Sequence, residues 1–92
     1  MMEFIVYIDI ELPVDLPDER LSELYRSEGE RARQLAGAGL LKRLWRVPGR
    51  RSNIGLWSAS DATELHEALA SLPLFPYMRI RVEALARHPS DP

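Results

Sequence analysis

Residues 3–12 read Glu-Phe-Ile-Val-Tyr-Ile-Asp-Ile-Glu-Leu, a stretch in which β-branched and aromatic residues recur with a period of two. This period is typical of a strand that buries one of its faces. The more apolar face would consist of Phe4, Val6, Ile8, Ile10 and Leu12. Because Pro13 has no backbone N–H to donate to a sheet, we expect the strand to cover residues 3–12 and to end there.

A helix and a hairpin are predicted to follow. Pro17 at the first helical position, with two acids directly after it, is typical of a helix start. The helix would continue to the Gly37-Ala38-Gly39 segment, where glycine favours termination. Residues 40–48 and 52–59 then predict two strands, joined by the turn residues Pro48-Gly49-Arg50-Arg51.

The last third of the chain predicts one more helix and one more strand. Asp61 and Glu64 have the spacing of a capping box, and the helix that they begin would run to about Ser71. The alternation of residues 77–85 predicts the last strand, and an irregular tail follows from about residue 86.

The order strand–helix–strand–strand–helix–strand predicts an α+β, ferredoxin-like plait over residues 1–92 as a single domain. In such a plait two helices cover one face of a four-stranded antiparallel sheet. The opposite face is bare in a monomer and would carry Ile5, Tyr7, Trp45 and Trp57. An exposed apolar face of this kind favours self-association.

Composition excludes several kinds of function. The chain has 92 residues and no cysteine, which excludes disulfides, iron–sulfur clusters and a cysteine nucleophile. Its two histidines, 22 residues apart, do not have the spacing of metal ligands. No apolar run is long enough for a membrane span, and no basic leader precedes one, so we expect a cytoplasmic protein without membrane contact.

Charge is unevenly distributed along the chain. Residues 1–30 carry nine acids and two bases, whereas residues 31–60 carry seven bases and no acid. The basic third could hold an anionic small molecule, a nucleic acid or the acidic third of another copy. Nucleic acid is not expected, because residues 52–58 lack the aromatic motif of RNA-binding plaits and the net charge is −2.

Glu28 is the main candidate for chemistry. It follows Leu24 by four residues and precedes Leu35 by seven, so it lies on the helix face that packs against the sheet. We expect it to be largely buried there, and burial raises the pKa of a carboxyl group toward the range useful for proton transfer. The alternative is a place at the edge of the apolar stripe, where Glu28 would pair with Arg31 or reach water.

Two cations and two uncharged polar residues complete the candidate set. Lys42 and Arg46 would share the helix-facing side of their strand and bind a carboxylate of the protein or of a ligand, while a charged rim is the alternative. Asn53 would either bond a ligand carbonyl or belong to the hairpin turn, and His66 would lie at the flank of its helix, where a structural or exposed role is the alternative. The turn arginines Arg50 and Arg51 are expected to be solvated.

Several strings of the sequence resemble the muconolactone Δ-isomerase family. The most specific is Leu-Pro-Leu-Phe-Pro-Tyr-Met at residues 72–78, and weaker matches are Leu-Trp-Arg at 44–46, Asn53, Leu65-His66 and Arg-His-Pro-Ser at 87–90. The resemblance covers roughly residues 3–90. It implies a small plait enzyme that uses no cofactor, assembles into a homo-oligomer, typically a decamer, and acts in the catechol branch of the 3-oxoadipate pathway.

The resemblance also implies a reaction. The ring double bond of muconolactone, a lactone with a carboxymethyl arm, moves out of conjugation with the carbonyl group to give 3-oxoadipate enol-lactone. Such a shift needs a proton carrier, a donor for the oxyanion and a cation for the carboxylate. Glu28 would be the carrier, Arg46 and Lys42 the cations, and Asn53 and His66 supporting contacts.

The chain departs from the family pattern in its basic third, where the Gly49-Arg50-Arg51-Ser52 turn is more basic than usual. Arg43 stands where the family usually has histidine, and Leu41 stands where it usually has tryptophan. These changes leave two alternatives open. One is a related enzyme that acts on a chlorinated lactone, a chloromuconolactone dehalogenase, and the other is a non-catalytic oligomeric plait that binds an anionic ligand.

Overall fold

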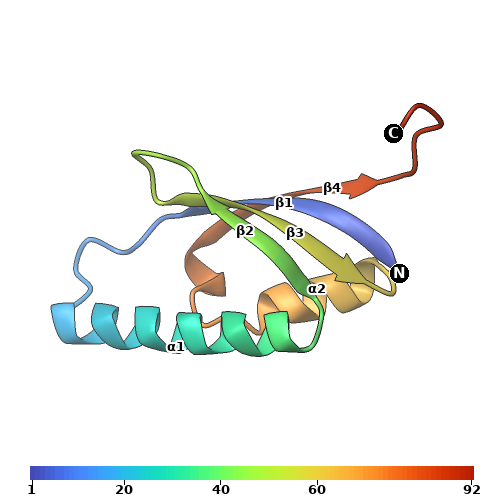
Figure 1. Cartoon of the computed structure of the whole chain (residues 1–92). Coiled ribbons are helices and arrows are strands. Elements are labelled where there is room, and N and C mark those ends of the chain that lie inside the picture. Colours follow the sequence, from blue (N-terminus) through green and yellow to red (C-terminus); the bar gives the residue numbers. More distant parts are fainter.

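A computed structural model describes residues 1–92 and confirms the ferredoxin-like α+β architecture (Figure 1). Two helices lie on one side of a four-stranded sheet, and the other side of the sheet is open. The elements are β1 Met2–Ile10, α1 Asp18–Gly37, β2 Leu41–Arg46, β3 Ser52–Ala59, α2 Ala62–Ala70, the short 3₁₀ helix η1 Phe75–Tyr77 and β4 Met78–Leu85.

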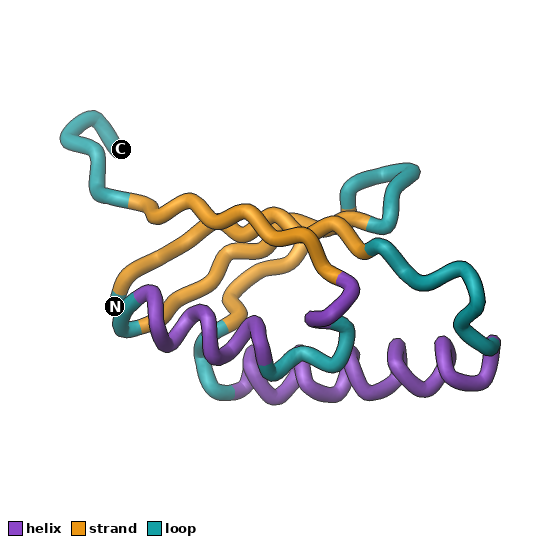
Figure 2. Tube along the Cα trace, turned by 180° about the vertical axis from the view of Figure 1, so that it is seen from behind, coloured by secondary structure: helices purple, strands orange, loops and turns teal.

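The sheet is antiparallel throughout, with the strand order β2-β3-β1-β4. Strand β1 therefore has a hydrogen-bonded neighbour along both edges. Val6, at its centre, lies opposite Gly55 of β3 and Val82 of β4. This register decides which side chains of β3 and β4 face the helices. Figure 2 shows both helices on the same side of the strands.

The core forms between β1 and the two helices. Phe4, Val6 and Ile8 point toward the helices and are buried, because side chains alternate between the faces of a strand. The helices cover them with the buried residues Leu35, Leu65, Ala68 and Leu69, and Leu72, just after α2, joins the same cluster. Neither helix is both long and apolar enough to cross a membrane.

The element boundaries differ from the sequence predictions at several places. β2 covers Leu41–Arg46 rather than residues 40–48, and β4 begins at Met78 because Tyr77 belongs to η1. β1 ends at Ile10 rather than Leu12, because the next residue, Glu11, donates its N–H to the carbonyl oxygen of Tyr77 at 2.7 Å, outside the strand ladders. Pro17 is the residue before the first helical residue of α1 rather than the first one itself, and no side chain caps this end.

The predicted cap of α2 is confirmed. The carboxylate of Asp61 accepts a hydrogen bond from the N–H of Glu64 at 2.8 Å. The Glu64 side chain in turn accepts the N–H of Ser60 at 2.8 Å. These two bonds satisfy donors that the first turn of the helix would otherwise leave unpaired.

A β-bulge in β2 overturns part of the predicted alternation. Leu41 lies opposite Trp57 and Arg43 opposite Leu56, so Lys42 is an extra residue between two paired ones. A helix-facing Lys42, as predicted, would put the adjacent Leu41 on the open face, but the bulge turns Leu41 toward the core, where it packs against the buried cluster. Sequence periodicity could not show this, because one inserted residue reverses the alternation on one side of it.

The predicted position of Trp57 on the open face is also wrong. Trp57 lies opposite Phe4 and is only 2% exposed, so it belongs to the core. Its indole lies over Gly55, where a Cβ atom would stand 2.6 Å from Nε1 of the ring. The absence of a side chain at position 55 thus leaves the space that the indole occupies.

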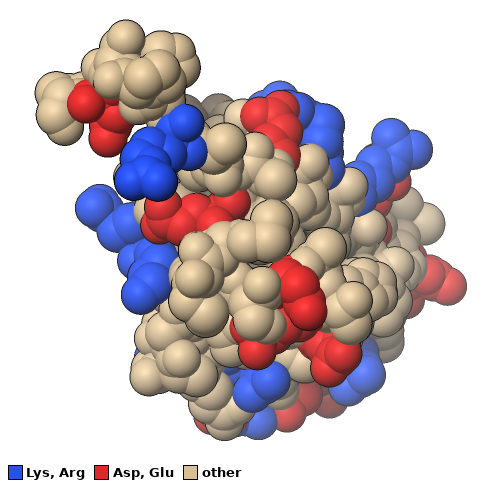
Figure 3. Space-filling view, turned by 90° about the vertical axis from the view of Figure 1, so that its right-hand side faces the viewer, with Lys and Arg blue, Asp and Glu red and all other residues tan.

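Charge is unevenly distributed along the sequence, but the end of the molecule seen in Figure 3 does not have a surface of a single charge. Acidic and basic side chains are interspersed there, and the C-terminal tail stands away from the body. The tail follows β4, which ends at Leu85, in agreement with the predicted boundary.

A side chain at position 55 should destabilise the fold. We expect Gly55→Ala to lower the free energy of unfolding by about 1–3 kcal/mol, the usual cost of overpacking a core, because the new methyl group displaces the Trp57 indole. Gly37→Ala is the matched control, since a Cβ there meets nothing within 4 Å. Urea unfolding measures both variants, and equal stability of the two would contradict the packing described.

Candidate functional site

An open cleft lies between α1, the end of the β2–β3 hairpin and the segment that leads into η1. Its volume is about 440 Å³, which lies within the usual range for small-molecule sites. The lining residues are Ile10, Tyr25, Glu28, Gly29, Ala32, Leu44, Trp45, Arg46, Arg51, Ser52, Asn53 and Leu74. The cleft therefore contains three predicted site residues, Glu28, Arg46 and Asn53.

Glu28 is fixed in this cleft by a backbone hydrogen bond. Its Oε1 accepts the N–H of Leu74 at 2.9 Å, across 46 positions of the sequence. The Leu74 side chain is fully buried, so the donor that holds the carboxylate is itself firmly placed. The second carboxylate oxygen, Oε2, has no hydrogen-bond partner in the chain and is free to act on a ligand.

The pKa of Glu28 is raised above its ordinary value. Burial causes the increase by disfavouring the charged form, and the hydrogen bond from Leu74 N–H offsets it in part. The side chain is half-buried rather than largely buried as predicted, because it faces the open cleft. The predicted alternative of a Glu28–Arg31 pair is not seen, since Arg31 donates instead to Ser71 Oγ at 2.9 Å and to Gln34.

A narrow recess of about 30 Å³ shares Glu28, Ala32, Leu44 and Asn53 with the cleft and is otherwise mostly apolar. Its remaining lining residues are Ile8, Leu41, Trp57, Leu72 and Met78. Two buried polar atoms of the side chains that line the recess, Asn53 Oδ1 and Trp57 Nε1, have no hydrogen-bond partner. Buried polar atoms are nearly always paired in folded proteins, so this recess is suited to a polar ligand atom or a water molecule.

Two arginines supply positive charge to the cleft. Neither Arg46 nor Arg51 forms an ion pair with an acid of the chain, whereas other arginines near the sheet do. An unpaired guanidinium beside a cleft is suited to a ligand carboxylate, which it can bind through two parallel hydrogen bonds. Arg51 was predicted to be merely solvated, and although it is exposed, it lines the cleft.

Lys42 and His66 lie outside this cleft. Lys42 is the exposed extra residue of the β2 bulge. His66 lies on the exposed side of α2 with its ring edge-on to Phe75, at 6.1 Å between ring centroids. It lines a separate apolar groove with Leu65, Phe75 and Val82. A single protomer therefore does not bring either residue to Glu28.

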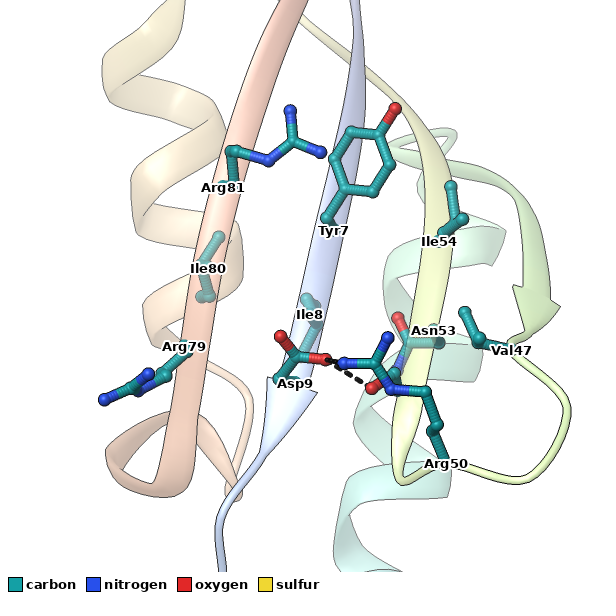
Figure 4. Close-up of a pocket in the computed structure, with 11 residues that line it drawn as sticks. Tyr7, Ile8, Asp9, Val47, Arg50, Asn53, Ile54, Arg79, Ile80 and Arg81 are labelled. Carbon is teal, nitrogen blue, oxygen red and sulfur yellow. Dashed lines mark hydrogen bonds and ion pairs between the residues drawn. The ribbon is translucent and has the colours of Figure 1, made fainter.

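A second hollow, of about 470 Å³, lies on the open face of the sheet (Figure 4). Its cations already have partners. Arg50 pairs with Asp9 at 3.4 Å, Arg79 with Glu11 at 3.2 Å, and Arg81 lies over the Tyr7 ring at 3.9 Å from the ring centre. These interactions leave little unsatisfied charge for a ligand, so the cleft beside Glu28 is the better candidate.

Sequence reasoning missed three residues around the site, namely Tyr25, Arg51 and Trp57. Two of them could have been found by spacing. Tyr25 precedes Glu28 by three residues on a helix, which places both on one face. Trp57 follows Asn53 by four residues on a strand, which has the same consequence.

The arrangement can transfer a proton to and from a small anionic ligand. A carboxylate with a raised pKa supplies the base, and the two arginines supply the counter-charge. The chain has no group of three His, Asp or Glu side chains that could hold a metal ion.

The family model described as muconolactone delta-isomerase matches residues 2–91. Muconolactone Delta-isomerase of Acinetobacter baylyi is 39% identical over 98% of this chain and 94% of its own length. The Rhodococcus opacus protein of the same name is 38% identical over 99% of this chain and 98% of its own length.

Two solved structures resemble the fold. A muconolactone isomerase crystal structure superposes with a TM-score of 0.91 at 39% identity, covering 98% of this chain and 94% of the other. A NIPSNAP domain protein from Burkholderia xenovorans superposes with a TM-score of 0.55 at 14% identity, which shows a shared fold alone.

Glu28 should make stability depend on pH. Because its pKa is raised on folding, the folded state binds more protons between pH 4.5 and the raised pKa, so stability falls as pH rises through this window. Glu28→Gln lacks this dependence. The native chain should therefore lose stability relative to Glu28→Gln as pH rises across this window. Urea unfolding of both chains at several pH values measures the difference between their unfolding free energies.

The matched control is Glu67→Gln on the exposed side of α2. Its unfolding free energy relative to the native chain should stay constant over the same window. The same pH trend in both variants would show that the trend does not come from Glu28.

Proposed function

The chain belongs to the muconolactone Delta-isomerase family, and from this premise we propose that it shifts the ring double bond of muconolactone to give 3-oxoadipate enol-lactone. It is an intramolecular isomerase in which one carboxylate, Glu28, removes a proton and returns it at another carbon. The observation that supports this role most directly is the Leu74 N–H bond, which holds a half-buried carboxylate of raised pKa in the cleft with Oε2 unpaired.

The reaction needs only a proton carrier and electrostatic support. Glu28 takes the proton from the ring carbon that bears the carboxymethyl arm, and the C–H electron pair moves through the conjugated system onto the lactone carbonyl oxygen. The resulting dienolate then re-forms the carbonyl group, and the carbon next to it takes the proton back from Glu28. No atom is gained or lost, and no external oxidant or reductant is required.

Arg46 would bind the carboxylate of the substrate arm. It lines the same cleft as Glu28, has no acidic partner in the chain and belongs to the matched Leu-Trp-Arg string. Arg51, which also lines the cleft, would add positive charge. Asn53 would contribute an uncharged polar contact near the ring, since its amide forms no hydrogen bond within the chain and lines both the cleft and the recess.

The departures at Arg43 and Leu41 have different places in the structure. Arg43 lies 5.2 Å from the ring centre of Trp45, on the open side of the sheet, so its replacement of histidine does not alter the recess of the same protomer. Leu41 does line the recess, and a smaller side chain than tryptophan there leaves more room beside Glu28.

We further propose that the protein assembles into a homo-oligomer, a decamer by family resemblance, and acts in the cytoplasm. Support comes from the open sheet face, where Ile5, Tyr7 and Leu56 are only partly covered and Trp45 is 44% exposed. Lys42 and His66 could meet substrate only through a neighbouring copy. Light scattering should show a mass several times that of the 10.5 kDa chain, and a monomer at micromolar concentration would contradict the proposal.

Glu28→Gln should abolish most turnover. We expect kcat on muconolactone to fall by at least ~10²-fold, the low end for a general acid–base residue, because glutamine keeps the Leu74 contact and cannot carry the proton. In the native enzyme kcat/KM should decline as pH falls through a pKa above 4.5. Conversion is followed by absorbance.

Glu30→Gln, on the exposed side of α1, is the control and should keep native turnover. Near-native turnover of Glu28→Gln would reject the carrier role. A native enzyme that converts only a chlorinated lactone would favour a dehalogenase-like enzyme, and one that binds the lactone without converting it would favour a binding module.

Arg46→Lys should weaken recognition of the substrate carboxylate. Lysine keeps the charge and loses the two-point contact, so kcat/KM should fall by ~10-fold or more, equal to about 1.4 kcal/mol. The preference for the acid over its methyl ester should shrink in the variant. Arg50→Lys, whose arginine pairs with Asp9 on the open face, should leave that preference unchanged. If Arg46→Lys and the native enzyme prefer the acid over its methyl ester to the same degree, Arg46 does not bind the substrate carboxylate.

A further inference from the structure

Trp57 presents a buried hydrogen-bond donor that nothing in the chain uses. The residue is 2% exposed, and its indole Nε1 has no acceptor. An indole N–H can only donate, so a backbone or side-chain oxygen would have to meet it, and none does. In folded proteins such a group is normally paired, which indicates that its acceptor comes from outside the chain.

The backbone of β3 determines where this donor lies. Asn53, Gly55 and Trp57 follow one another on the helix-facing side of the strand, opposite Ile8, Val6 and Phe4 of β1. A Cβ atom at Gly55 would lie 2.6 Å from Nε1 and 3.1 Å from Cδ1 of the indole. The N–H edge of the ring therefore lies over Gly55, on the side of Trp57 where Asn53 stands.

Trp57 lines the same recess as Glu28. Trp57, Asn53 and Glu28 all line the volume of about 30 Å³, and its other walls are apolar. A volume of this size accommodates one or two small atoms, such as a carbonyl oxygen or a water molecule. An acceptor atom placed there would share the recess with Trp57 and with a carboxylate that is half-buried and fixed by Leu74 N–H.

The proposed isomerisation generates such an acceptor. When Glu28 removes the ring proton, the electron pair of the C–H bond ends on the lactone carbonyl oxygen, which becomes negatively charged. A donor fixed in an apolar wall stabilises this charge better than water, because it is already oriented when the charge develops. A neutral donor has a further advantage here, because it does not lower the pKa of the adjacent carboxylate as a cation would.

Resting on the proposed function, we propose that Trp57 is a catalytic residue whose Nε1–H donates a hydrogen bond to the lactone carbonyl oxygen and stabilises the dienolate. Gly55 is the positioning residue that lets the indole reach the recess. Asn53 adjoins the same oxygen, and rotation of its amide by a half turn would place Nδ2–H where Oδ1 now lies.

The first test observes the donor directly by NMR. The chain has two tryptophans, so two indole N–H signals are expected, and Trp45→Phe assigns them. The probe is the saturated lactone with the same carboxymethyl arm, which cannot isomerise because it lacks the ring double bond. Binding should move the Trp57 indole proton downfield and slow its exchange with water.

A water molecule that bridges Trp57 Nε1 to Asn53 Oδ1 is the competing explanation for the unpaired atoms. In that case the Trp57 signal would not move downfield when the saturated lactone binds, and the inference would be overturned. This measurement uses the native indole at position 57, so it remains decisive even if substitutions at this core position impair folding.

The second test is kinetic. Trp57→Phe keeps most of the ring volume and removes the N–H, so we expect kcat on muconolactone to fall by about 10²–10³-fold, as for the loss of an oxyanion donor, with little change in KM. Urea unfolding shows whether the variant is folded. Leu69→Met, which repacks a buried leucine of α2, is the matched core control and should keep kcat within about threefold.

The outcomes separate this inference from the function on which it rests. If the native chain does not isomerise muconolactone, the proposed function fails and the role of Trp57 fails with it. If the native chain is active and folded Trp57→Phe keeps kcat within about threefold, the role of Trp57 alone is rejected. A large loss of kcat together with the downfield shift supports it.

Discussion

The burial of one face of β1 is the constraint on which the rest of this structure depends. Phe4, Val6 and Ile8 are at most 4% exposed, and the strand that carries them is bonded along both edges. Since most of the driving force for folding comes from removing apolar surface from water, both helices must lie on the side to which these residues point. The opposite side of the sheet is left open, as Figure 1 shows.

The same packing creates the site. Leu72 and Leu74 belong to the segment that connects α2 to η1 and are buried, and their burial places the Leu74 N–H beside α1. That N–H binds Glu28 Oε1 at 2.9 Å and thereby fixes a carboxylate that the helix alone would leave to rotate freely. The Leu-Pro-Leu-Phe-Pro-Tyr-Met string therefore acts through its backbone, by orienting Glu28, as well as through its apolar side chains.

Burial rather than ion pairing determines the direction in which the pKa of Glu28 is shifted. A guanidinium in contact with the carboxylate would lower its pKa, and neither Arg31 nor Arg46 makes that contact. The cations Arg46 and Arg51 instead line the cleft without contacting Glu28, so they can neutralise an incoming carboxylate. The unpaired indole N–H of Trp57 is compatible with the same requirement, because it is polar and uncharged.

The sequence by itself determined the order of the elements, the cap of α2 and the inward position of Glu28, because these depend on residues within one or two helical turns or on a local period. Only the tertiary structure decided which residues of β2 and β3 face the recess. The bulge at Lys42 turned Leu41 inward, and pairing with Phe4 put Trp57 in the core. The hydrogen bond from Leu74 N–H to Glu28 could not be predicted from local sequence either, because 46 positions separate the two residues. Strand register and backbone contacts over such distances depend on how the whole chain buries its apolar surface. Local sequence propensity does not determine this burial.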